Sequence, residues 1–172
     1  MFKELEVLQN FLQALQNSAT ATAIREGERL FPWIECVHVL ALTLVIGSIA
    51  IVDLRLIGLT SRNRSVVQTM TLALPVTWSA FVVAAITGGL LFSSNATVYA
   101  YNAYFQVKLG LIALAGMNMG VFHLFLGKGA AGWHTPPLTP WRARVAGGLS
   151  LSLWIAIAAC GRWIGFTISA LK

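Results

Sequence analysis

The stretch PWIECVHVLALTLVIGSIAIVDLRLIGL, residues 32–59, decides the fold class. It is longer than the roughly 20 apolar residues that a helix needs to cross the hydrocarbon core of a bilayer. No charged residue lies between Glu35 and Asp53. Its apolar residues do not alternate with polar ones, as they would in a strand of a membrane barrel. The stretch therefore predicts a transmembrane helix.

Three further apolar stretches predict the same structure, at residues 70–92, 104–126 and 145–171. Of the 172 residues, 57% are hydrophobic and only 10% are charged, whereas a soluble domain has roughly 25% charged residues. This composition excludes a soluble single domain, a disordered chain and a coiled coil. We therefore expect an all-α integral membrane protein, with a four-helix bundle over residues 31–172.

The first 30 residues have a different pattern. Their apolar residues recur at steps of three and four, which places them on one face of a helix. These residues are Phe2, Leu5, Leu8, Leu12 and Leu15. Such a face lies flat in the membrane interface, so we expect an interfacial amphipathic segment over residues 1–30. Thr22 is suited to cap a second short helix that runs to Leu30.

The distribution of charge predicts how the bundle lies in the membrane. The net charge is +6, yet the loop at residues 93–103 contains no Lys or Arg, whereas the first and third loops do. Cytoplasmic loops are enriched in Lys and Arg. We therefore expect a multi-pass protein of the bacterial inner membrane with both termini on the periplasmic side. The basic residues serve this topology, and we expect no nucleic-acid partner.

Pairs of glycines predict close helix contacts. Gly116 and Gly120 are four residues apart, as are Gly161 and Gly165. Small residues at this spacing allow two membrane helices to approach closely. We expect these positions to pack against other helices of the bundle or against a second copy in a homo-oligomer.

Ionisable side chains inside the spans are costly to bury in lipid, so each is a functional candidate. Their depths along the predicted helices form two clusters. The cluster near the predicted outer face contains Glu35, His38, Lys108 and Arg162. The cluster near the cytoplasmic face contains Asp53, Arg55 and His123, with the polar Asn118 on the same span as His123. The sequence therefore predicts a polar site at each end of the bundle.

The outer cluster has the residue types that a haem requires. Neutral imidazole is a common ligand of haem iron, which makes His38 the candidate axial ligand, with Glu35 three residues away to orient it. Gly47 leaves room for the macrocycle, and Lys108 and Arg162 are cations for the propionates. These residues predict a b-type haem protein that transfers electrons in or across the bilayer.

His123 belongs to a separate site. His38 and His123 differ in depth by roughly 18–20 Å at 1.5 Å per residue, which is too far for one iron. His123 would ligate a second haem or serve a quinone site, so we expect one or two b haems and a quinone or a periplasmic redox protein as partner. Two structural interpretations stay open. His38 and Glu35 can form a structural hydrogen bond, and Asp53 and Arg55 an ion pair that anchors the helix end.

Three motifs carry a resemblance to known proteins. Residues 33–38 (WIECVH) open the first span, residues 53–58 (DLRLIG) close it, and residues 102–108 (NAYFQVK) open the third. Over about Phe31 to His123 the chain resembles a bacterial family of small four-span membrane proteins of unknown function. More distantly, it resembles the HemJ-type protoporphyrinogen oxidase and the CopD-type copper-resistance membrane domain.

The HemJ-type resemblance implies a haem or porphyrin site at His38 and Lys108. Of the usual HemJ-type Trp-Phe-Ala-Gly-Leu pattern only the glycine is present, as Gly47, and the Met and His residues typical of CopD-type domains are missing. Two alternatives to electron transfer follow. One is a HemJ-like enzyme that oxidises protoporphyrinogen, and the other is a cofactor-free membrane subunit with a structural role or a role in copper or small-ion transport. Whether the chain is an enzyme stays open.

Overall fold

The computed structural model describes residues 2–60, 66–126 and 140–169, and every regular element in these ranges is helical. This confirms the all-α class. Four helices are long and apolar enough to cross a membrane, as a multi-pass protein requires. They are α3 (Leu30–Ile57), α4 (Val66–Ser94), α6 (Ala103–Val121) and α7 (Trp141–Ser169).

Two of the long helices begin well before the apolar stretches that predicted them. The second begins at Val66 rather than residue 70, and the fourth begins at Trp141 rather than residue 145. The physical reason is that backbone N–H and C=O groups near the membrane need internal partners, so the helical hydrogen bonds continue into the polar ends. A count of apolar residues detects only the part that lies in the hydrocarbon core.

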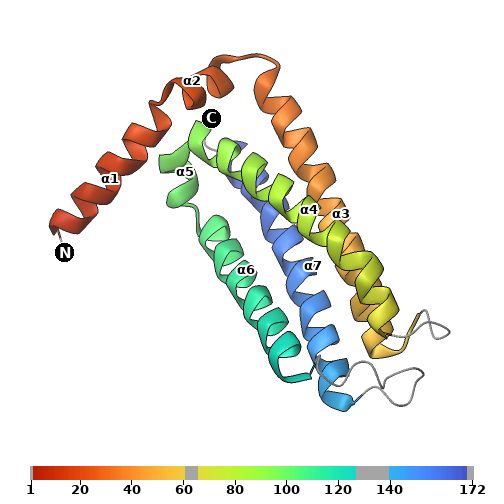
Figure 1. The fold of residues 1–172 in the computed structure, drawn as a ribbon. Coiled ribbons are helices and arrows are strands. Elements are labelled where there is room, and N and C mark those ends of the chain that lie inside the picture. Colours follow the sequence, from red (N-terminus) through yellow and green to blue (C-terminus); the bar gives the residue numbers. More distant parts are fainter. Residues whose placement is uncertain (1, 61–65, 127–139, 170–172) are drawn as a thin grey trace.

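The four long helices pack in the spatial order α4, α3, α7, α6. Helix α3 packs against α4 on one side and against α7 on the other, and α6 packs against α7. Over the described residues, α4 and α6 make no comparable contact. Figure 1 shows α4 and α6 on two sides of the bundle, with α7 between and behind them. The bundle is therefore less tightly closed between α4 and α6.

Single glycines set the closest helix contacts. A Cβ atom at Gly88 on α4 would lie 3.0 Å from His38 Cε1, and one at Gly147 on α7 would lie 3.1 Å from the backbone oxygen of Asp53. The pair Gly116 and Gly120 behaves differently, because a Cβ at either position would meet nothing within 4 Å. Among the described residues, no other helix therefore makes the close contact that we expected at this pair.

The N-terminal segment forms a bent arm at one end of the bundle (Figure 1). It consists of α1 (Phe2–Gln16) and α2 (Ala19–Glu26). Helix α1 packs against the short α5 (Ala96–Ala100), and α2 packs against α4 and α3. The cap of α2 is Ser18, not Thr22, because Ser18 has extended backbone angles and its side chain accepts a hydrogen bond from the Ala21 N–H.

Hydrogen bonds tie this arm to the bundle. The Gln16 side-chain oxygen accepts from the Thr97 backbone N–H at 3.1 Å and from the Thr97 hydroxyl at 2.7 Å. The Arg25 guanidinium donates to the Ser94 backbone oxygen at 3.1 Å. Of the apolar residues on α1, Leu12 is buried, whereas Leu8 is about half exposed. The arm is thus anchored at the end of α4 and keeps apolar surface exposed.

Candidate functional site

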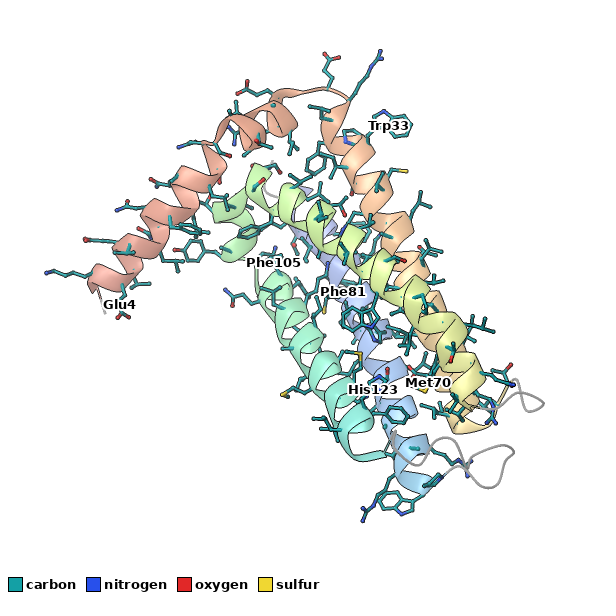
Figure 2. All side chains as sticks on the ribbon, in the orientation of Figure 1. Glu4, Trp33, Met70, Phe81, Phe105 and His123 are labelled. Atoms are coloured by element: carbon teal, nitrogen blue, oxygen red, sulfur yellow. The ribbon has the colours of Figure 1, made fainter. Side chains whose placement is uncertain are left out.

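A cavity of about 280 Å³ lies between the four long helices, at the end where α3 finishes and α7 begins. All four helices contribute to its lining. Its walls are mainly apolar and aromatic, and Trp78 and Phe81 meet edge to face with ring centroids 6.1 Å apart. Figure 2 shows Phe81 and Met70 on α4 and His123 beyond α6, around the space between these helices. Cavities of this kind bind small molecules.

Asp53 is the charged group of this cavity that is most deeply buried. It lies near the end of α3 and is 5% exposed, and its Oδ2 atom has no hydrogen-bond partner. The Ser150 hydroxyl on α7 interacts with the carboxyl group. Buried polar atoms are usually satisfied by a partner. An unsatisfied carboxyl oxygen in the lining of a cavity marks a place where a ligand can supply the missing hydrogen bond.

The sequence places Asp53 here through a close approach of two helices. Gly147 has no side chain where α7 crosses α3, and a Cβ there would also lie 3.1 Å from Leu56 Cβ. One residue earlier, the backbone oxygen of Ala146 accepts a hydrogen bond of 3.0 Å from Asn118 Nδ2 on α6. Asp53 and Asn118 therefore flank the same turn of α7, residues 146–150.

On the α4 side of the cavity, the polar side chains have hydrogen-bond partners within the protein. Thr77 Oγ1 and Ser48 Oγ are hydrogen-bonded at 2.7 Å, with either hydroxyl as the donor. The hydroxyl that accepts in this pair donates to its own helix backbone, Thr77 to the Ala73 oxygen or Ser48 to the Leu44 oxygen. These hydroxyls hold α3 against α4, so they have less capacity for a ligand than Asp53.

A π-helical turn, Phe122–Leu126, follows α6 and carries His123. Phe122 is buried in a small core with Leu56 and Val66, and its ring meets the His123 ring edge to face at 5.7 Å. His123 itself is exposed at the border of the cavity. Such π-turns occur frequently at functional sites, because the extra residue redirects the side chains that follow.

The opposite end of the bundle holds a different polar group, formed by His38 and Lys108. His38 Nδ1 and Thr87 Oγ1 are hydrogen-bonded at 3.0 Å, and Gly88 lies against the same imidazole. Lys108 on α6 is close enough for its charge to act on His38. Its Nζ atom would lie 3.6 Å from a Cβ at Gly161 on α7. The structure thus brings these two residues together in a packed environment.

The other residues of the predicted outer cluster, Glu35 and Arg162, are exposed and interact with residues outside this pair. The hydrogen bond to His38 that we expected from Glu35 comes from Thr87 instead. Glu35 is exposed. Burial, and after it the charge of Glu35, raises the pKa of the Tyr99 phenol, which lies outside the spans. Arg162 is exposed, and its guanidinium stacks 4.8 Å from the Phe166 ring centroid.

Gly47 and Arg55 lie outside the cavity lining. A Cβ at Gly47 would meet no described residue within 4 Å. Arg55 is fully buried but does not line the cavity. Asp53, Asn118 and His123, by contrast, share the lining of one cavity.

One feature of the site concerns metal binding. Within the described residues, no three His, Cys, Asp or Glu side chains lie close enough to hold a metal ion.

The sequence did not predict the residues that shape the cavity. They are Met70, Trp78, Phe81, Ser150 and Trp154. Apart from one serine they are apolar, and an apolar side chain in a membrane helix has the same sequence signal whether it faces lipid, a neighbour or a cavity.

Comparison with known proteins places this site within one family. Residues 29–167 match the family model described as a family of unknown function (DUF6644). The matched range contains all four long helices and therefore both polar groups, and it leaves α1 and α2 outside. No curated protein and no solved structure matches the chain.

Proposed function

The chain belongs to this family of unknown function, and we propose that it binds a lipid-soluble quinone or quinol in the cavity and takes part in electron transfer in the bilayer. One observation carries the proposal. A cavity of about 280 Å³, walled by aromatic rings, contains a buried carboxyl group with one oxygen that lacks a hydrogen-bond partner. A flat ring with polar atoms at its edge is complementary to both features.

The helix arrangement supports entry from the membrane. A quinone dissolves in the hydrocarbon core, so its path to a site need not cross water. Helices α4 and α6 both line the cavity, yet they make little contact with each other. A ligand can therefore reach the cavity between them from the lipid side.

A haem at His38 is the second candidate, and the geometry of His38 favours it. The Thr87 hydroxyl donates to the Val83 backbone oxygen at 2.7 Å, so its oxygen is left to accept from His38 Nδ1. Such a bond orients a ligating imidazole and leaves Nε2 for iron. Lys108 nearby is a cation for a propionate, as the HemJ-type resemblance also implies. The cavity, however, is not lined by His38, so the quinone proposal has the stronger geometric support.

Three further properties are proposals that follow from charge and composition. The Lys and Arg residues in the first and third loops place the cavity end of the bundle toward the cytoplasm, with both termini in the periplasm. A bacterial inner membrane is the location that agrees with this arrangement. The open position Gly120, which lies outside the cavity lining, is available to a second copy in a homo-oligomer.

Titration of the purified full chain with decyl-ubiquinone tests the main proposal. The protein is kept in a mild detergent, and the fluorescence of its tryptophans reports binding, because Trp78 and Trp154 line the cavity. We expect saturable quenching with one quinone per chain. The control is detergent micelles without protein, in which a free tryptophan derivative is dissolved. Quenching that rises linearly with decyl-ubiquinone and also with anaerobic decyl-ubiquinol, as it does for simple partition into these micelles, would contradict the proposal.

An absorption spectrum of the same sample tests the haem candidate. We expect a Soret band, with sharp α and β bands after reduction with dithionite, if haem is bound. His38→Ala should then lose the haem, whereas His123→Ala is the matched control and should keep it. Full occupancy in His38→Ala would exclude His38 as the ligand. A colourless protein from haem-replete cells would exclude a resident haem and leave the HemJ-type resemblance without a cofactor.

A further inference from the structure

We infer that the cavity selects the reduced, hydroxyl-bearing quinol over the oxidised quinone, because the polar atoms that flank residues 146–150 of α7 accept hydrogen bonds. This inference rests on the proposed function and names the form of the ligand. A quinone has two carbonyl oxygens, which only accept hydrogen bonds. A quinol has two hydroxyl groups on the same ring, which also donate.

Asp53 supplies the first acceptor. Its Oδ2 atom is buried without a hydrogen-bond partner, and the interacting Ser150 hydroxyl is itself a donor to the carboxylate. In its ionised form, which the hydrogen bond from Ser150 favours, the Asp53 carboxylate accepts hydrogen bonds and cannot donate them, and the inferred selectivity belongs to this form. A quinone carbonyl at this place would set two oxygen acceptors against each other. A quinol hydroxyl would satisfy Oδ2 with a charge-assisted hydrogen bond, which is stronger than a neutral one.

Asn118 supplies the second acceptor. Its Nδ2 atom donates to the Ala146 backbone oxygen at 3.0 Å, and this bond fixes the orientation of the amide because a carbonyl oxygen only accepts. The amide oxygen, Oδ1, is therefore the atom left for a ligand. Both acceptors flank one turn of α7, so they lie at the same end of the cavity.

The remaining lining does not offset this acceptor character. No Lys or Arg is found among the described residues that line the cavity. The donors that remain are the indole N–H groups of Trp78 and Trp154 and the ring of His123, and these belong to the walls and the border. A quinone held by a wall indole would still leave Asp53 without a partner. Leaving a buried acceptor unsatisfied lowers affinity.

Three probes with the same ring and tail separate these cases. They are decyl-benzohydroquinone, its dimethyl ether and decyl-benzoquinone, each titrated anaerobically into the full chain in detergent. The ether keeps the shape of the quinol and lacks only its donors. Because a site built to hydrogen-bond a hydroxyl strongly rejects the analogue that lacks it, we expect the hydroquinone to bind at least about tenfold more tightly than the ether and the quinone.

Two variants then locate the selectivity. Asp53→Asn keeps the size of the side chain but replaces one acceptor by a donor, so it should abolish the preference for the hydroquinone over the quinone. Should Asp53→Asn not fold, as judged by gel filtration, Ser150→Ala tests the same carboxyl group. It removes the hydrogen bond that favours the carboxylate form, and because a protonated carboxyl can donate to a quinone, the preference for the hydroquinone should fall. Ser79→Ala is the matched control, because the exposed Ser79 hydroxyl donates only to its own helix backbone.

The possible outcomes separate this inference from the proposed function. Equal or tighter binding of the quinone would overturn the inference and leave the proposed function standing. No saturable binding of any of the three probes would overturn both. Tighter binding of the lipophilic cation tetraphenylphosphonium than of the hydroquinone would also overturn the inference, because the carboxylate would then serve a cation. An unchanged preference in Asp53→Asn would remove Asp53 as its origin.

Discussion

The two polar ends of the bundle contain similar residue types in opposite surroundings. At one end His38 lies against Gly88, hydrogen-bonded to Thr87 and near Lys108. At the other end Asp53 lines a cavity of about 280 Å³ and keeps one oxygen without a hydrogen-bond partner. An ionisable residue in a membrane helix carries a desolvation penalty that a hydrogen-bond partner must offset. Whether this partner comes from the protein or from a ligand depends on the space beside the residue.

The largest expected effect concerns the packed end. Gly88→Val places a side chain where a Cβ alone would lie 3.0 Å from the His38 ring. Overpacking of this kind costs about 1–3 kcal/mol, so we expect a clear loss of stability in denaturant titrations in detergent. Gly89→Val is the matched control, because a Cβ there would meet nothing within 4 Å. Equal stability of the two variants would show that the His38 ring is not tightly packed against Gly88.

The open end should respond in the opposite way. Gly116 lines the cavity, and a Cβ there would meet nothing within 4 Å. Gly116→Leu should therefore fill the cavity, leave stability unchanged and weaken quinol binding about tenfold or more, which is roughly 1.4 kcal/mol. Gly120→Leu, one turn further along α6 and outside the lining, should bind the quinol normally. Full binding by Gly116→Leu would place the ligand elsewhere.

A smaller effect tests the hydrogen bond at the packed end. Thr87→Val removes the partner of His38 Nδ1 while keeping the shape of the side chain. Hydrogen bonds between membrane helices contribute about 0.6 kcal/mol on average, and the hydrogen bond of the imidazole with the Ala84 backbone remains, so we expect a loss of about 0.6 kcal/mol in the free energy of unfolding. Thr71→Val is the control, because the Thr71 hydroxyl bonds only to its own helix. Equal stability of the two variants would argue against a structural role for the His38–Thr87 pair.

The smallest effect concerns the arm beyond the packed end. Gln16→Ala removes the oxygen that accepts from both the backbone and the hydroxyl of Thr97. A hydrogen bond of this kind contributes about 0.5–1.5 kcal/mol, and local unfolding of the arm should limit the loss to the lower end of that range. Faster hydrogen exchange over α1 than in the exposed control Gln13→Ala would report the release of the arm. Unchanged exchange would mean that apolar contacts alone, such as those of Leu12, hold it.

The sequence predicted the elements of the fold well, for a physical reason. A bilayer core demands long apolar helices, and this demand appears in each span as a count of apolar residues. The prediction of Thr22 as the cap of α2 was wrong, because Ser18 is also a good capping residue and only the backbone angles select it. The predicted starts of α4 and α7 were four residues too late, because polar residues near the interface continue a helix without contributing to its apolar count.

The site was only partly determined by the sequence. Residue types and depth alone predicted polar groups at both ends, and the structure brings His38 near Lys108 and places Asp53, Asn118 and His123 around one cavity. Tertiary structure alone decided that Thr87 rather than Glu35 contacts His38, and that α4 and α6 stand apart to leave the cavity. The physical reason is that lipid and helix interiors are equally apolar. A sequence therefore shows which residues enter the membrane, whereas only packing determines which of them face protein, lipid or a cavity.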